Sequence, residues 1–221
     1  MSKTAKGQDA TVASEAPTFI EFILDETGSM CSLVNTTVGG FNDFLKEQQA
    51  QTGQCLMTLT KFHSSRVRTP YTDLEVQMAP KLSAETFQPD GGTNLRDTII
   101  SRIDAAQDRL GALAGEANVV MIVMTDGEDT CSRYTERDVA ARLKERMDHG
   151  WTFVFLAAYE RALPVAEALG FPLGNSKSFA RSEVRETMTK VAHATTAYRS
   201  TRSSGLVASG TTSSTYFSGE F

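Results

Sequence analysis

Apolar runs of strand length alternate along this chain with longer segments in which apolar residues recur at helical spacing. Residues 18–24 and 118–124 are apolar at nearly every position, which is typical of strands buried on both faces of a sheet. Residues 95–113 instead carry an apolar residue every three or four positions, which predicts an amphipathic helix with Gly115 beyond its end. Strands and helices are therefore expected in turn.

The remaining predicted elements continue this alternation. A stripe of apolar residues predicts a helix over 33–45, although Gly39 and Gly40 lower its intrinsic propensity and indicate close packing against a neighbour. Two β-rich runs flank His63-Ser64-Ser65, so they form a hairpin that gives the sheet an antiparallel edge. These two runs are residues 54–62 and 66–74. Further strands are predicted over 151–158 and 177–180, and further helices over 135–149, 164–169 and 181–198.

This order of elements predicts an α/β fold: a doubly wound, mostly parallel central sheet with one antiparallel edge strand and helices on both faces. We expect residues 1–16 to be a flexible leader, residues 17–199 to form the domain, and residues 200–221 to be a flexible tail rich in Ser, Thr and Gly. A second reading of the tail is a short motif whose aromatic residues dock onto a partner or another copy of the chain.

Composition narrows the class of protein. A length of 221 residues with 40% apolar content is enough for one core. The net charge of -5 gives no basic surface for nucleic acid, and no run approaches the roughly 18 apolar residues of a membrane span. Three cysteines, an odd number, favour a reducing compartment, so we expect a cytoplasmic protein. Cys55 reads as a buried apolar residue, and Cys31 and Cys131 follow the candidate metal loops.

Oxygen-bearing side chains gather directly after the two most apolar strands. Asp25, Thr27 and Ser29 follow the first strand at alternate positions, and Asp126 follows the strand 118–124. Thr93 lies on a third loop, after Gly91-Gly92. In open α/β sheets, ligands bind beyond the carboxyl ends of the strands, where the strand order reverses. Carboxylates and hydroxyls are suitable ligands for a hard cation, so these five residues predict a site for Mg²⁺, with Mn²⁺ or Ca²⁺ as alternatives.

The same residues resemble the metal-ion-dependent adhesion site of the von Willebrand factor type A family. That pattern is Asp-x-Ser-x-Ser, then a distant Thr and a distant Asp; here Thr27 stands where Ser is usual and keeps a hydroxyl. The resemblance implies a Rossmann-like fold and an ion with an open position for an Asp or Glu carboxylate of another protein. It also implies a non-enzymatic adaptor, with AAA-type ATPases or other multi-protein assemblies as partners.

Other interpretations of these residues stay open. Asp25 and Asp126 can be read as helix caps, but capping does not explain Thr93. A Mg²⁺-dependent phosphohydrolase would also use an Asp after the first strand, yet such chemistry usually has a second acid where Thr27 stands. The sequence lacks the phosphate-binding Gly-x-x-x-x-Gly-Lys pattern and the Gly-x-Ser-x-Gly nucleophile turn. A self-assembling component that uses the tail is a third possibility.

Further acidic residues accompany the candidate ligands. Glu26, Glu128 and Asp129 are expected on the rim of the site, where they would adjust its charge. Asp97 follows Thr93 by one helical turn and is expected either to orient that loop or to cap it, from outside the ligand set.

Overall fold

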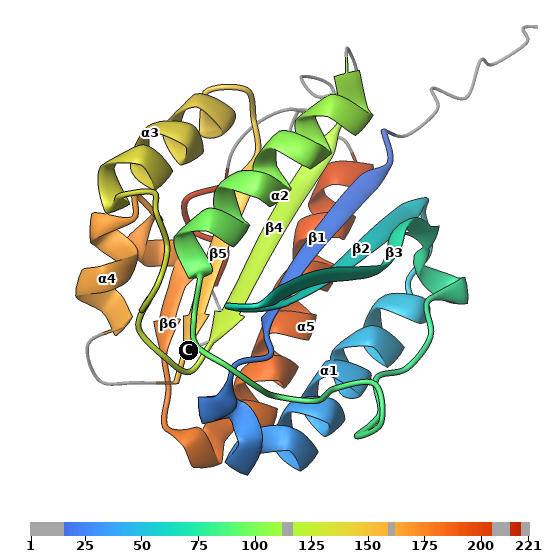
Figure 1. The fold of residues 1–221 in the computed structure, drawn as a ribbon. Coiled ribbons are helices and arrows are strands. Elements are labelled where there is room, and N and C mark those ends of the chain that lie inside the picture. The colour runs from blue at the N-terminus through green and yellow to red at the C-terminus, as the bar shows by residue number, and fades with distance from the viewer. Residues whose placement is uncertain (1–15, 112–116, 159–161, 205–212, 218–221) are drawn as a thin grey trace, which may run out of the picture.

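A six-stranded sheet lies between two layers of helices in the computed structural model, which describes residues 16–111, 117–158, 162–204 and 213–217 (Figure 1). The strand order is β3-β2-β1-β4-β5-β6, with β3 antiparallel to β2 and every other neighbouring pair parallel. The predicted fold class is therefore confirmed. The strands are β1 (Thr18–Asp25), β2 (Cys55–His63), β3 (Arg66–Glu75), β4 (Asn118–Thr125), β5 (Thr152–Ala157) and β6 (Ser176–Ser178).

The helices divide between the two faces of the sheet. Helices α1 (Val34–Gln49) and α5 (Val184–Ser203) cover one face, and α2 (Leu95–Leu110), α3 (Glu136–Met147) and α4 (Ala162–Ala168) cover the other (Figure 1). Each face has its own apolar cluster, and alternate residues of β1 serve the two clusters. Burial on both faces explains why β1 and β4 read as continuous apolar runs rather than as alternating ones.

Several helix ends differ from the sequence expectation, and α1 continues to Gln49, four residues beyond the predicted end. Helix α2 stops at Leu110 because Gly111 adopts a positive φ of 51°, earlier than the predicted end at residue 113. The predicted stop at Gly115 lies outside the described residues. Helix α5 starts at Val184, after a 3₁₀ turn over Arg181–Glu183, and continues to Ser203.

The segment expected to be a flexible tail is partly built into the domain. Residues 200–203 extend α5, and Tyr216 and Phe217 are each only 6% exposed and join the core on the α1 and α5 face. Asn175 fixes this segment, because its side chain donates to Ser213 O and accepts from Tyr216 N. These residues are therefore ordered parts of the domain and not of a flexible tail. The two aromatic rings bury apolar area, although the segment as a whole is rich in Ser, Thr and Gly. Residues 1–15 of the expected leader, together with 205–212 and 218–221, lie outside the described part.

The two glycines of α1 have different surroundings. A Cβ at Gly40 would lie 3.0 Å from Met188 Cγ and 3.1 Å from Met188 Cβ, whereas a Cβ at Gly39 would meet nothing within 4 Å. Gly40 therefore allows α1 and α5 to approach closely, as expected from the sequence, and Gly39 has no such role.

This contrast gives a matched prediction. Gly39→Ala gains helix propensity and should raise the free energy of unfolding by about 1 kcal/mol. Gly40→Ala gains the same propensity but overpacks Met188, so it should be at least about 1 kcal/mol less stable than Gly39→Ala. Urea unfolding of both variants measures the difference. Equal stabilities would show that α1 and α5 have room for a methyl group at residue 40.

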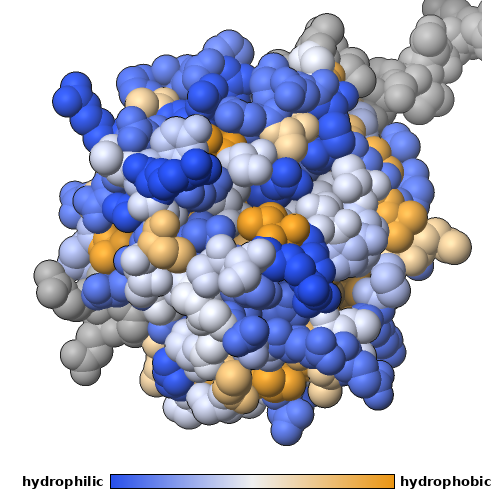
Figure 2. Space-filling view, in the orientation of Figure 1, coloured by the Kyte–Doolittle hydropathy of each residue, from blue (hydrophilic) through white to orange (hydrophobic). Residues whose placement is uncertain are grey.

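The face of the molecule seen in Figure 2 is mostly hydrophilic, and its apolar residues form small separate groups. No helix in the described ranges has both the length and the apolar character needed to cross a membrane.

Candidate metal centre

The candidate ligands lie at the lower edge of the sheet in Figure 1, where β1 and β4 end side by side. The chain runs from β1 outward to β2 and β3, and later returns to the other side of β1 through β4, so the strand order reverses between β1 and β4. Asp25 is the last residue of β1, and Asp126 directly follows the last residue of β4. The sheet therefore places both acids at the reversal point.

Asp25 is fully buried and its carboxylate is held on both oxygens. Oδ1 accepts from Thr27 N at 2.7 Å, and Oδ2 accepts from the Thr125 hydroxyl at 2.5 Å. Burial raises the pKa of Asp25 from 3.8 to about 6, against the lowering effect of these hydrogen bonds and with a smaller raising effect from the charge of Asp126. A bound cation would relieve this cost of burying the charge.

Direct contacts join the ligands of the loop after β1 to Asp126, the ligand of the loop after β4. The Ser29 hydroxyl donates to Asp126 Oδ1 at 2.5 Å, and Thr27 Oγ1 lies 3.1 Å from Ser29 Oγ. The Asp126 side chain is 1% exposed, and its second oxygen accepts from Arg181 Nη2 at 2.7 Å. A chain of oxygens thus runs from Thr27 through Ser29 to Asp126.

Backbone contacts fix the loop that carries Thr93. Gly28 N donates to Gly91 O at 3.0 Å, and Thr130 N donates to Thr93 O at 2.9 Å. Gly127 marks where the loops converge, because a Cβ at that position would lie 3.5 Å from Ser29 Oγ and 3.8 Å from Thr93 Oγ1. The missing side chain leaves a small space faced by both hydroxyls.

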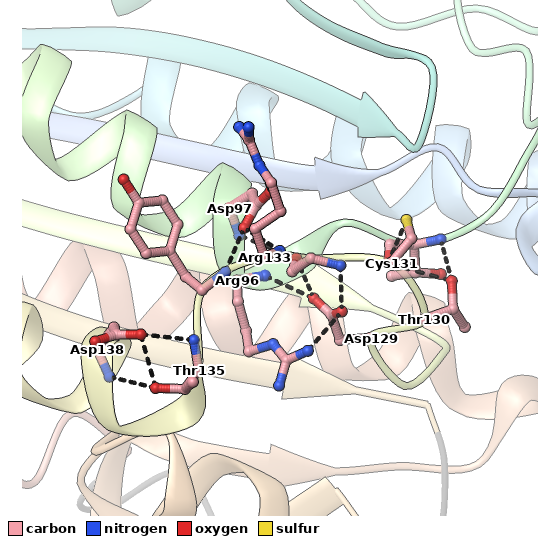
Figure 3. Close-up of polar contacts among 11 residues, drawn as sticks. Arg96, Asp97, Asp129, Thr130, Cys131, Arg133, Thr135 and Asp138 are labelled. Carbon is pink, nitrogen blue, oxygen red and sulfur yellow. Dashed lines mark hydrogen bonds and ion pairs between the residues drawn. The ribbon is translucent and has the colours of Figure 1, made fainter.

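Figure 3 shows how the loop after β4 is held. The Asp129 carboxylate accepts from Arg96 N at 2.9 Å and forms an ion pair with the Arg96 side chain. Burial would raise the pKa of Asp129, but the hydrogen bonds it accepts from Arg96 and Ser132 bring that pKa below its usual value. Asp97 accepts from the backbone N–H groups of Arg133 and Tyr134, so it holds the loop after β4 rather than the loop of Thr93 for which it was expected.

Glu26 is not on the rim, contrary to the expectation from sequence. Its side chain is buried on the opposite side from Asp25, as successive residues leaving a strand are, and it pairs with Lys61 at 3.1 Å and Arg68 at 2.6 Å. Gln88 N also donates to this carboxylate. Glu26 therefore ties the loop before Thr93 to β2 and β3 instead of adjusting the charge of the site.

The helix-cap interpretation does not account for Asp126. Its two oxygens accept from the side chains of Ser29 and Arg181, and helix α3 is capped by Thr135 in a capping box with Asp138 (Figure 3). Asp25 accepts one backbone N–H, that of Thr27, which stands before a 3₁₀ turn over Gly28–Leu33. Capping is thus at most a part of what Asp25 does.

The three cysteines are free thiols. Cys55 is buried, as expected. Cys31 and Cys131 are exposed, and each thiol donates to a backbone carbonyl, that of Pro89 and that of Thr93 respectively.

The donor set determines which ion fits. Within the described ranges, no group of three or more His, Cys, Asp or Glu side chains is arranged for a metal. The candidate set instead combines two carboxylates with three hydroxyls, which is a composition suited to Mg²⁺ and not to zinc or other soft metals. The buried, repelling carboxylates and the space beside Gly127 are consistent with a small hard cation.

Comparison with solved structures shows the fold of von Willebrand factor type A domains. Similar structures include the ArnB paralog VWA2 from Sulfolobus acidocaldarius (17% identity, 80% of this chain and 46% of that chain, TM-score 0.57). A von Willebrand factor type A protein from Catenulispora acidiphila is also similar (14% identity, 82% of this chain and 43% of that chain, TM-score 0.55). The pilus adhesin SpaC from Lactobacillus rhamnosus GG is a third (14% identity, 80% of this chain and 30% of that chain, TM-score 0.61).

This chain spans less than half the length of each of these proteins. No protein-family model matches the sequence, and no curated protein does.

Proposed function

We propose that this chain, which has a von Willebrand factor type A fold, is a protein-binding module whose capture of a partner depends on a divalent metal ion. The ligands would be Asp25, Thr27, Ser29, Thr93 and Asp126. The observation that carries the proposal is the convergence of these side chains, from three loops far apart in sequence, at the carboxyl ends of β1 and β4.

The chain's own residues prepare the site in two ways. Thr125 and Thr27 N orient the Asp25 carboxylate, and the Ser29 hydroxyl orients one oxygen of Asp126, so the negative charge is held at fixed positions. Of the five ligands only Asp25 and Asp126 carry charge, and their two negative charges balance the two positive charges of the ion. When bound, the ion supplies a Lewis-acidic position at which an Asp or Glu carboxylate of the partner protein can coordinate. We infer that Mg²⁺ is the resident ion, and multi-protein assemblies such as those of AAA-type ATPases are the partner class.

The environment does not favour catalysis. Asp25 is fully buried, and both of its oxygens already accept hydrogen bonds, so it is poorly placed to attack a phosphoryl group. The site is therefore better suited to holding an ion than to forming a covalent intermediate.

Calorimetric titration with Mg²⁺ and Mn²⁺ tests the metal site. Ser29 is exposed, so Ser29→Ala should leave the fold intact while it removes a ligand and the hydrogen bond to Asp126. We expect at least about tenfold weaker ion binding, equivalent to about 1.4 kcal/mol. Ser65→Ala, an exposed serine in the β2–β3 turn, is the matched control and should bind as the wild type does. No heat with the wild-type protein would refute the metal site.

Partner capture tests the rest of the proposal. Immobilised wild-type protein should retain a protein in Mg²⁺ that is lost in EDTA and with Ser29→Ala, and kept with Ser65→Ala. Substituting exposed Asp and Glu residues of that partner should then identify one whose loss abolishes binding. A partner that binds equally with and without the ion would contradict the proposed mechanism while leaving the fold unchanged.

A further inference from the structure

Arg181 contacts the candidate site from an element that supplies no proposed ligand. It begins the 3₁₀ turn before α5, and its Nη2 donates to Asp126 Oδ2 at 2.7 Å. Its Nη1 lies 3.2 Å from Ser32 Oγ and 3.4 Å from Ser29 O. The guanidinium therefore places a positive charge directly on a carboxylate proposed to hold the ion.

Both oxygens of Asp126 are engaged in this arrangement. Ser29 donates its hydroxyl proton to Oδ1, and Arg181 donates to Oδ2. The Asp126 side chain is 1% exposed, so without a cation its charge would be buried and poorly compensated. Arg181 supplies that compensation from a guanidinium that is itself 48% exposed.

We infer that Arg181 is an internal competitor of the divalent ion. In the ion-free protein it neutralises Asp126, and an incoming ion must take this carboxylate over from it. This inference rests on the proposed metal site. It adds that Arg181 lowers the affinity of that site for the ion. Without the ion, Arg181 compensates the negative charge of Asp126.

The local structure allows the exchange at small cost. None of the three residues of the 3₁₀ turn is buried, and Glu183 fixes the start of the turn by accepting from Ala180 N at 2.9 Å. The arginine side chain can thus move into solvent while the backbone that carries it stays in place. Arg185 is a contrasting case, since its guanidinium pairs with Asp43 on α1, away from the proposed ligands.

Titration with Mn²⁺, followed by electron paramagnetic resonance of the free ion, measures the competition. We expect Arg181→Gln to bind Mn²⁺ about fivefold more tightly than the wild type, because the ion no longer has to break the Arg181–Asp126 ion pair. Fivefold is equivalent to about 1 kcal/mol, which is what a pair with a half-exposed arginine contributes. Arg185→Gln removes the same charge near the start of the same helix and should bind as the wild type does. Equal tightening in both variants would indicate a general effect of charge and would overturn the inference.

Thermal unfolding supplies a second readout. In EDTA, Arg181→Gln should be less stable than the wild type, because Asp126 loses its partner, and saturating Mg²⁺ should remove this difference. Unchanged or weaker Mn²⁺ binding by Arg181→Gln, while the wild type binds, would overturn the role of Arg181 alone. Absence of binding in every variant would overturn the metal site and the inference together, so the two failures are distinguishable.

Discussion

Tyr216→Ala should lower the free energy of unfolding by about 3 to 5 kcal/mol, as removal of a buried aromatic side chain does. The Tyr216 ring is 6% exposed and packs against Tyr198 and Phe217, with ring centroids 6.0 and 5.3 Å apart. Its hydroxyl contacts that of Thr195, which already donates to Val191 O. The loss therefore combines a cavity in the core with a broken buried hydrogen bond. Urea unfolding with circular dichroism measures it.

Two further variants make this prediction specific. Tyr134→Ala removes the same side chain where it is 46% exposed and should change stability by less than about 0.5 kcal/mol. Tyr216→Phe keeps the ring and should lose only about 1 kcal/mol, the contribution of the hydroxyl. If Tyr216→Ala were as stable as Tyr134→Ala, the aromatic segment would not be docked on the domain in solution, and the expectation of a flexible tail would hold.

The docking of Tyr216 shows where composition misleads. The segment 200–221 is dominated by Ser, Thr and Gly, which favours disorder, and its few apolar residues, Tyr216 and Phe217 among them, give only a weak signal of burial. Docking also requires Asn175, a residue 41 positions away in sequence, to satisfy the backbone of the segment. Neither local propensity nor periodicity reports a contact of that kind.

The sheet was predictable because its physical cause is local. Strands β1 and β4 are buried on both faces, so nearly every residue had to be apolar, and the sequence shows this directly. The placement of Asp25 and Asp126 followed from the same argument, because residues after adjacent parallel strands must meet. Thr93 depended on a motif rather than on periodicity, since its loop is positioned by hydrogen bonds to the loop after β4.

Side-chain direction and long-range pairing were not predictable. Glu26 follows Asp25 by one residue, and only the structure shows that it turns toward Lys61 and Arg68. Arg181 lies 55 residues after Asp126 in a turn without a motif, so no sequence signal identifies it as a contact of the site. Charged side chains pair according to which loops meet in space, and that depends on the whole fold.

Asp25→Asn should stabilise the ion-free protein at neutral pH. The folded protein raises the pKa of Asp25 from 3.8 to about 6, mainly through burial, so between these values the folded state binds more protons than the unfolded state. Stability therefore falls as the pH rises through this interval, and the full cost, up to about 3 kcal/mol, is present at pH 7. Asparagine carries no charge to bury, and its carbonyl can still accept from Thr27 N. The Thr125 hydroxyl can accept from the new amide, because it also lies 3.1 Å from Gly127 O, to which it can donate.

The same substitution should have the opposite effect when Mg²⁺ is present. An amide oxygen is a weaker ligand than a carboxylate, so Asp25→Asn should lose most of the stabilisation that a bound ion gives to the wild type. We therefore expect the thermal midpoints to cross: the variant unfolds at a higher temperature in EDTA, and the wild type does so in saturating Mg²⁺. Repeating the EDTA comparison near pH 4 is the control, because there Asp25 of the folded wild type is largely protonated and no longer buries a charge, so the advantage of the variant should shrink. A variant less stable than the wild type in EDTA at pH 7 would show that the Asp25 charge is compensated within the ion-free protein, which would remove the electrostatic reason for a cation at this site.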